Sequence, residues 1–170
     1  MRLFFALWPP PETARALAAW AAQVQRASGG RAVATPNIHL TLAFLGDADP
    51  GKATAAARRV TGERFELPLT VGKYWKHNNI VWVGPQDVPP ALGQLAERLQ
   101  LELFRDGFIL DRRPFAAHIT LLRKASPPGP LPAVPAVSWP VGEFVLVQSA
   151  RDNSGSKYVV VDRFRCQTTV

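Results

Sequence analysis

A four-residue motif that occurs twice constrains this chain more than any other feature. It reads His-Leu-Thr-Leu from His39 to Leu42 and His-Ile-Thr-Leu from His118 to Leu121. Because side chains alternate between the two faces of a strand, the histidine and the threonine of each motif share one face, and the apolar residues share the other. Each copy therefore predicts a strand that is apolar toward a core and carries an imidazole and a hydroxyl on its other face.

The histidine count strengthens this interpretation. The chain contains three histidines, and two of them occupy the repeated motif. We therefore predict that the two strands face one groove and form a paired-histidine site. The third histidine, His77, precedes two asparagines that are typical of a turn, and we predict that it is a surface residue. The three histidines lack the short spacing of a zinc site, and we expect neither a metal nor another cofactor.

Length and charge limit the class of protein. With 170 residues and a net charge of +7, we expect one domain over residues 1–170, made of two similar lobes, with polyanions such as RNA or nucleotides as partners. Solubility alone is the alternative explanation of the charge. The single cysteine, Cys166, excludes an internal disulfide. No apolar run is long enough to span a bilayer, and residues 1–10 are too short for a signal peptide. We expect a cytoplasmic monomer without a membrane partner.

Periodicity predicts a mixture of helices and strands. We expect helices over 11–28, 51–60 and from the prolines at 89–90 to Arg105, and strands over 2–7, 31–34, 39–45, 65–75, 80–84, 108–110, 117–123, 141–150 and 157–164. The proline-rich segment 125–140 should run irregularly over the surface. Because helices and strands do not alternate strictly, we predict an α+β fold of two largely antiparallel sheets. A pseudo-twofold, bilobal arrangement with helices outside would place the two motif strands across a central groove.

Two imidazoles facing one groove are suited to acid–base catalysis at phosphorus. The pKa of an unperturbed imidazole is roughly 6.5, so one ring can accept a proton while its partner delivers one. The attacking and leaving oxygens lie on opposite sides of a phosphorus atom, which matches histidines on two sides of a groove. The hydroxyls of Thr41 and Thr120 could donate to the non-bridging oxygens. We find no carboxylate cluster of the kind that holds Mg²⁺.

Longer stretches around the motifs carry a family resemblance. Residues 2–9 read Arg-Leu-Phe-Phe-Ala-Leu-Trp-Pro, 39–46 read His-Leu-Thr-Leu-Ala-Phe-Leu-Gly, 81–84 read Val-Trp-Val-Gly, and 113–121 read Arg-Pro-Phe-Ala-Ala-His-Ile-Thr-Leu. With the closing hairpin that contains Tyr158, they make the chain resemble the 2H phosphoesterases. More closely, it is similar to the bacterial RNA 2′,3′-cyclic phosphodiesterases, also called 2′-5′ RNA ligases. The resemblance implies a bilobal α+β fold and metal-independent, ATP-independent opening of a 2′,3′-cyclic phosphate to a 2′-phosphate, with reversible 2′-5′ ligation in some members.

The resemblance also implies roles for the residues five positions after each histidine. Phe44 would contact the base or ribose, and Arg123 the phosphate or base. Strict alternation places a residue five along on the opposite face from the histidine, so for Arg123 to reach the site its strand must bulge or end first. Two departures from the family pattern bear on how the strands enter the groove: Ala117 stands where proline is usual, and Thr-Pro-Asn at 35–37 replaces Pro-Glu-Asn.

We therefore predict an RNA 2′,3′-cyclic phosphodiesterase whose partners are RNA or nucleotides with 2′,3′-cyclic phosphate ends. The predicted site comprises the catalytic residues His39 and His118, the phosphate-binding residues Thr41, Thr120 and Arg123, and the base- or ribose-binding residue Phe44. We expect His118 to act as base and His39 as acid. The alternatives are a non-catalytic RNA- or nucleotide-binding module and a 2H enzyme acting on a small nucleotide phosphodiester.

Four further residues near the motifs keep two interpretations each. Trp75 and Trp82 could stack on bases, but core packing is the better interpretation for Trp82 and an equal one for Trp75. Arg112 and Arg113 flank the second motif and could attract phosphate, although solvated surface charge explains them equally well.

Overall fold

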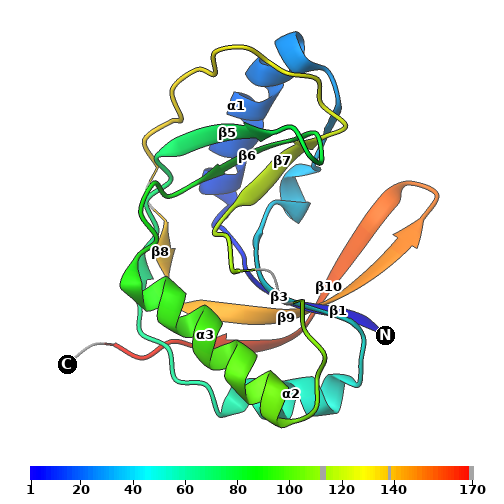
Figure 1. The fold of residues 1–170 in the computed structure, drawn as a ribbon, viewed down its shortest axis with the longest axis vertical. Helices are drawn as coiled ribbons and strands as arrows, with labels where there is room; N and C mark the ends of the chain where they lie inside the picture. Colours follow the sequence, from blue (N-terminus) through cyan, green and yellow to red (C-terminus); the bar gives the residue numbers. More distant parts are fainter. Residues whose placement is uncertain (112–113, 138, 169–170) are drawn as a thin grey trace.

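The fold is described from a computed structural model (Figure 1), which describes residues 1–111, 114–137 and 139–168. Two four-stranded sheets have the strand orders β10-β9-β1-β3 and β2-β7-β6-β5, and a small third sheet joins β4 and β8. The strands are β1 (Arg2–Leu7), β2 (Arg31–Ala32), β3 (Leu40–Asp47), β4 (Phe65–Glu66), β5 (Val71–Trp75), β6 (Ile80–Gly84), β7 (Ile119–Arg123), β8 (Pro140–Val141), β9 (Glu143–Asp152) and β10 (Gly155–Arg165). The strands of these sheets pair antiparallel, which confirms the predicted α+β class.

The helices are α1 (Pro11–Ser28), α2 (Pro50–Arg58) and α3 (Pro90–Arg105), and Thr35–Asn37 forms a single 3₁₀ turn, η1. Each α-helix has proline in its first turn, where the missing N–H would have no partner in any case. The leucines that repeat with helical spacing along α3 are buried, as predicted: Leu92, Leu95, Leu99 and Leu103. Apolar periodicity thus places all three helices correctly.

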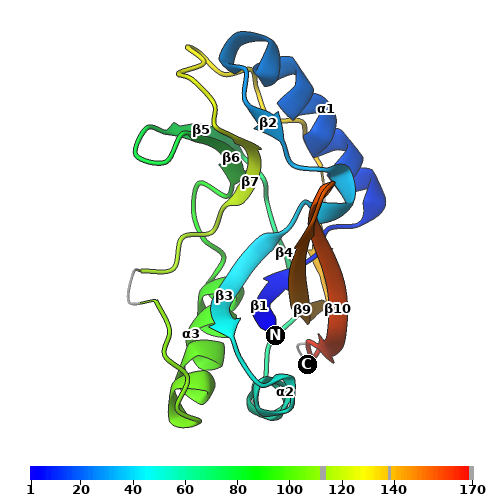
Figure 2. The same cartoon turned by 90° about the vertical axis from the view of Figure 1, so that its right-hand side faces the viewer.

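A strand–helix–strand unit occurs once in each half of the fold. In β1–α1–β3 the two strands are antiparallel neighbours in one sheet, and in β6–α3–β7 they are antiparallel neighbours in the other. Each unit packs its helix on the opposite sheet. Helix α1 lies against β2 and β7, whereas α3 lies against β3 and beside α2 (Figures 1 and 2). The predicted pseudo-twofold relation therefore takes the form of two units that exchange their helices.

Strand β1 is buried on both of its faces. Leu3, Phe5 and Leu7 belong to a large hydrophobic cluster that also contains most of the buried residues of β6 and β7 in the other sheet. Phe4 and Ala6 point to the opposite face and pack with two valines of β9, Val145 and Val147, and with Trp8 and Tyr158. A hydrophobic cluster that continues across both sheets is consistent with a single domain. The organisation as one domain of two similar lobes stays a prediction.

Several predicted boundaries are wrong. The strand expected over 65–75 is broken between β4 and β5, because Pro68 cannot donate to a ladder and Leu67 N–H instead bonds to the carbonyl of Trp139 at 2.9 Å. Residues 108–110 form no strand, because the N–H of Phe108 closes the end of α3 on the Leu103 carbonyl at 3.1 Å. The strand expected over 31–34 comprises only β2, and Arg112 and Arg113 lie outside the described residues.

Candidate active site

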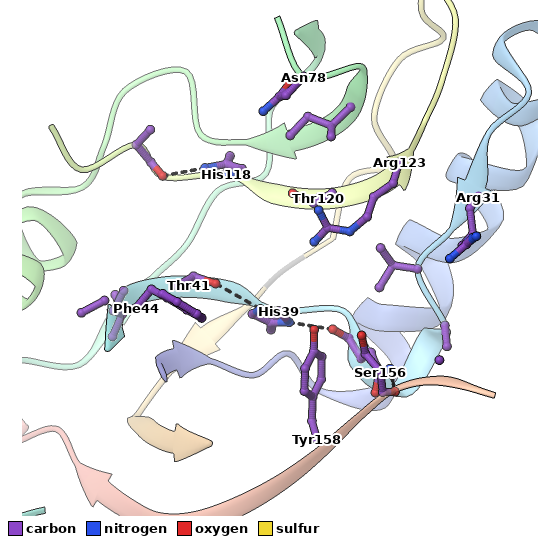
Figure 3. Close-up of a pocket in the computed structure, with 18 of the residues that line it drawn as sticks. Arg31, His39, Thr41, Phe44, Asn78, His118, Thr120, Arg123, Ser156 and Tyr158 are labelled. Atoms are coloured by element: carbon purple, nitrogen blue, oxygen red, sulfur yellow. Dashed lines mark hydrogen bonds between the residues drawn. The ribbon is translucent and has the colours of Figure 1, made fainter. Parts of the chain in front are cut away.

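A large cavity lies between the two motif strands. Its volume is about 1160 Å³, and its walls include both histidines and both threonines of the repeated motif, together with Phe44. The histidines occupy the positions immediately before β3 and β7 rather than the strands themselves. Figure 3 shows the two motifs on facing strands, with the open space of the cavity between them. The structure therefore brings together the predicted residues His39, Thr41, His118 and Thr120.

Both imidazoles are anchored to the backbone in the same way. Nδ1–H of His39 donates to the carbonyl of Asn37 at 2.7 Å, and Nδ1–H of His118 donates to the carbonyl of Ala116 at 2.8 Å (Figure 3). In each case the acceptor lies two residues before the ring. A ring whose Nδ1 carries the proton keeps Nε2 as its basic nitrogen. The same local geometry thus fixes the tautomer of both histidines and leaves Nε2 for chemistry.

An aromatic cage surrounds the first ring. Trp8 stacks on His39 with ring centroids 4.9 Å apart and an angle of 10° between the planes. Phe4 lies 5.0 Å from the same ring, and Tyr158 meets it edge-on at 5.4 Å. The hydroxyl of Thr41 donates to Nε2 of His39 at 3.1 Å. The ring of His39 is therefore held by three aromatic contacts and two hydrogen bonds.

The second ring has a different environment. Trp75 lies 4.7 Å from His118 and Trp82 lies 6.0 Å away, measured between ring centroids. Thr41 donates a hydrogen bond to Nε2 of His39, but Thr120 makes no such bond to Nε2 of His118. No other described side chain makes it either. Trp82 is half-buried and belongs to neither hydrophobic cluster of the described residues, so the predicted core-packing role is not confirmed. Its ring contacts Trp75 at 4.8 Å between centroids, and Trp75 lines the cavity.

Burial lowers the proton affinity of both histidines. Desolvation lowers the pKa of His39 to about 4, against the opposing effect of the bond to the Asn37 carbonyl. The positive charges of Arg123 and of His118, which line the same cavity, lower the pKa of His39 further. Desolvation, and then Arg123, also lowers the pKa of His118 below its usual value.

A β-bulge in β3 returns Phe44 to the face of the cavity. Thr41 lies opposite Ala6 of β1, and Ala43 lies opposite Phe5, so Leu42 is an extra residue in the ladder. Leu42 and Ala43 are consequently both buried, although they are adjacent, and Phe44 is 48% exposed on the cavity wall. The guanidinium of Arg2 lies 5.4 Å from the ring centroid of Phe44.

The same irregularity occurs at the equivalent place in β7. Thr120 lies opposite Trp82 and Leu122 opposite Val81, so Leu121 is the extra residue. Leu121 and Leu122 are both buried, and the exposed Arg123 returns to the cavity wall. Strict alternation required the strand either to bulge or to end before Arg123 could reach the site, and the structure shows the bulge. Figure 3 shows the Arg123 side chain extending toward the space between the two histidines.

Sequence reasoning missed three residues that line or shape the site. Trp8 and Tyr158 form the cage of His39, and Arg31 lines the cavity beside Arg123. A signal for Trp8 was present, because it continues the period-two series of Phe4 and Ala6 onto the side of the histidine. Arg31 and Tyr158 come from other strands, and only the sheet topology brings them near.

Residues 1–111, 114–137 and 139–168 contain neither a metal-binding cluster nor a membrane-spanning helix. No group of three or more His, Cys, Asp or Glu side chains there is arranged so that it could hold a metal ion. None of the helices there combines the length and the apolar character that a membrane span requires. His77 is exposed, as predicted, and lies at the wall of the cavity.

Comparison with known proteins gives consistent matches. A family model described as LigT like phosphoesterase matches residues 7–82. The chain is 37% identical to the RNA 2′,3′-cyclic phosphodiesterase of Escherichia coli (strain K12), over 96% of this chain and 95% of that protein. It is 31% identical to the protein of the same name from Thermus thermophilus, over 96% of this chain and 89% of that protein.

A solved structure extends the match to the fold. The crystal structure of Escherichia coli LigT complexed with 3′-AMP covers 97% of both chains with a TM-score of 0.89 and 36% sequence identity. The same protein has also been solved in complex with ATP. Sequence and fold thus agree over nearly the whole length, and the chain belongs to the family of LigT-like 2H phosphoesterases.

Proposed function

We propose that this protein hydrolyses the 2′,3′-cyclic phosphate ends of RNA to 2′-phosphates by acid–base catalysis between His39 and His118, without a metal ion. The observation that carries the proposal is the pair of imidazoles on one cavity, each anchored through Nδ1 with Nε2 left for proton transfer. Relatives that match nearly the full chain bear the name of this activity.

The reaction needs one proton acceptor and one proton donor on opposite sides of phosphorus. One imidazole takes a proton from water as the water oxygen bonds to phosphorus. The bond from phosphorus to the 3′ oxygen breaks, and the second imidazole protonates that oxygen. The hydroxyls of Thr41 and Thr120 and the guanidinium of Arg123 would hold the negative charge on the non-bridging oxygens. A 5′-hydroxyl in place of water would give a 2′-5′ linkage by the same transfer.

The terminal nucleoside would lie toward Phe44. This ring is exposed on the cavity wall and can stack on a base or pack against the ribose. Aromatic stacking tolerates every base, because each base has a π face. Nucleotide complexes of the Escherichia coli relative support a nucleotide as the ligand of this cavity.

The direct test is incubation with an oligoribonucleotide that ends in a 2′,3′-cyclic phosphate, in EDTA, with the product end identified by mass spectrometry and phosphatase sensitivity. We expect full turnover in the chelator and a 2′-phosphate product. Tight, salt-dependent binding without turnover would instead identify a non-catalytic RNA-binding module. Turnover confined to mononucleotide cyclic phosphates would identify an enzyme of small phosphodiesters.

A further inference from the structure

Two arginines form a directly opposed pair at one end of the cavity. Arg31 of β2 and Arg123 of β7 are partners in the antiparallel ladder. Like charges directly opposite each other in a sheet are destabilising. Both residues are exposed and both line the cavity. Among the residues that the structure describes, neither guanidinium has an ion-pair partner, so nothing in this part of the protein compensates the repulsion.

The backbone is built to hold this unfavourable pair. Gly30 has φ of +91°, and a Cβ at that position would lie 2.6 Å from the carbonyl oxygen of Arg123. Only glycine therefore lets the chain approach β7 closely enough for β2 to form. The side chain of Gln25 donates to the Gly30 carbonyl at 3.0 Å and fixes the approach. The position of Arg31 is thus set by the sheet rather than by a flexible loop.

The opposite wall at this end adds another cation. Arg151, in the hairpin of β9 and β10, lines the same cavity, and the hairpin is tied down by a bond of 3.1 Å from the Asn37 amide to the Ser156 carbonyl. The neighbouring carboxylate of Asp152 accepts from both N–H and O–H of Ser154 and lies 3.9 Å from the ammonium of Lys157. This end of the cavity therefore carries three arginines, Arg31, Arg123 and Arg151, against the carboxylate of Asp152, so its net charge is positive.

We propose that Arg31 binds the phosphodiester on the 5′ side of the terminal ribonucleotide, so that the protein selects oligonucleotide ends over nucleosides. The inference rests on the function proposed above. In a ribose, the base is attached at C1′ and the 5′ carbon at C4′, on either side of the C2′–C3′ edge that carries the cyclic phosphate. Phe44 and Arg31 lie on opposite sides of the histidine pair (Figure 3). With the base on Phe44, the 5′ phosphate extends toward Arg31.

This arrangement divides the work between the opposed arginines. Arg123 serves the reacting phosphate between the histidines, and Arg31 serves the next phosphate along the chain. Arginine suits such a contact because its planar guanidinium can bond a phosphate through two N–H groups at once. Binding of two anions removes the repulsion that the free protein carries between these two side chains.

The test compares two ligands that differ only at the 5′ position. Binding of adenosine 3′-phosphate and of adenosine 3′,5′-bisphosphate is measured by calorimetry with the wild type, with R31Q, and with the matched control R26Q. Arg26 is an exposed arginine of α1 outside the cavity wall, so both variants lose the same charge. We expect the ratio of affinities, bisphosphate over monophosphate, to fall about tenfold in R31Q, and to keep the wild-type value in R26Q.

A turnover measurement separates this inference from the function. Wild type and R31Q are given a dinucleotide with a cyclic phosphate end, and the same dinucleotide with an uncharged methylphosphonate linkage. We expect R31Q to remove the wild-type preference for the charged linkage. A wild type that hydrolyses neither substrate overturns the proposed function, whereas the calorimetry still decides on Arg31. The inference is overturned if R31Q keeps the wild-type affinity ratio. It is also overturned if R26Q lowers the affinity ratio as much as R31Q does.

Urea unfolding distinguishes a folding defect from a lost contact. Because R31Q removes a like-charge repulsion, we expect its unfolding midpoint to equal or exceed that of the wild type. A lower midpoint together with a reduced affinity for both ligands would mean that Arg31 supports the fold, and would contradict a role in binding.

Discussion

The two histidine motifs have nearly the same sequence and the same backbone anchor, yet they end in different surroundings. His39 is enclosed by Trp8, Phe4 and Tyr158 and accepts a bond from Thr41 at 3.1 Å, whereas His118 contacts two tryptophans and lacks the matching threonine bond among the described residues. The motif thus specifies where the ring is held and which nitrogen is basic. The other strands specify how readily the ring takes a proton.

This difference favours distinct roles in the proposed reaction. Burial lowers the pKa of His39 to about 4, and the Thr41 hydroxyl, as a donor to Nε2, stabilises the neutral ring. The pKa of His118 is lowered as well, so what distinguishes the two rings is the Thr41 bond, which His118 lacks among the described residues. On this ground we propose that His39 acts as base and His118 as proton donor. We now favour this assignment, which is the reverse of the one that the sequence led us to expect.

The largest expected effect is the loss of either imidazole. We expect H39Q and H118Q each to lower kcat for a cyclic-phosphate dinucleotide by about a hundredfold or more, because each removes an acid or a base from the transition state. Steady-state kinetics, with urea unfolding to verify the fold of each variant, measure the effect. Either variant with kcat close to the wild type would rule out the two-histidine mechanism.

A sulfur substrate sharpens the comparison of the two rings. When sulfur replaces the 3′ oxygen of the cyclic phosphate, the leaving thiolate needs no proton. We expect H118Q to recover most of its lost kcat on this substrate and H39Q to stay inactive, since only the acid becomes dispensable. Recovery of H39Q instead would restore the assignment of His118 as base.

The next effect is on stability in acid. As pH falls from 7, the unfolded chain binds a proton at His39 near pH 6.5, while the folded protein binds it only near pH 4. The free energy of unfolding therefore falls across this window, by roughly 3 kcal/mol from this residue. Urea titrations at a series of pH values should show that the free energy of unfolding falls more between pH 7 and pH 4 in the wild type than in H39Q. Parallel curves for the two proteins would contradict the strong burial of this ring.

The smallest expected effect distinguishes the two threonines. We expect T41V and T120V each to lower kcat about tenfold, by removing a donor to the non-bridging oxygens. Only T41V should also raise the pKa of His39, because only Thr41 donates to its Nε2 in the free protein. Histidine NMR titrations measure this directly. Equal shifts in the two variants would mean that the hydrogen bond does not set the difference between the rings.

Much of the fold could be predicted because local patterns determine it. The leucines of α3 and the proline at the start of each helix are short-range signals, and their helices lie where they were expected. The errors occur where tertiary bonding overrides pattern. Residues 108–110 have strand-like composition, but Phe108 caps a helix instead.

The candidate site divides along the same line. His39, Thr41, His118 and Thr120 could be identified as a set because a repeated motif with period two places them on one face. The bulges at Leu42 and Leu121 could not, because an extra residue in a ladder depends on the partner strand. The catalytic roles of these residues stay predictions until the variants are measured.

The exchange of helices between the two strand–helix–strand units has a mechanical consequence. Helix α1 packs on the sheet that bears His118, and α3 packs on the sheet that bears His39. Each sheet therefore depends on a helix from the other unit to complete its hydrophobic core. A hinge motion that moved the two sheets apart would pull each helix away from the sheet on which it packs. We therefore expect the distance between the two imidazoles to resist such a motion. If the chain were cut in the loop between β5 and β6, the two fragments would have to associate before either could form a complete hydrophobic core.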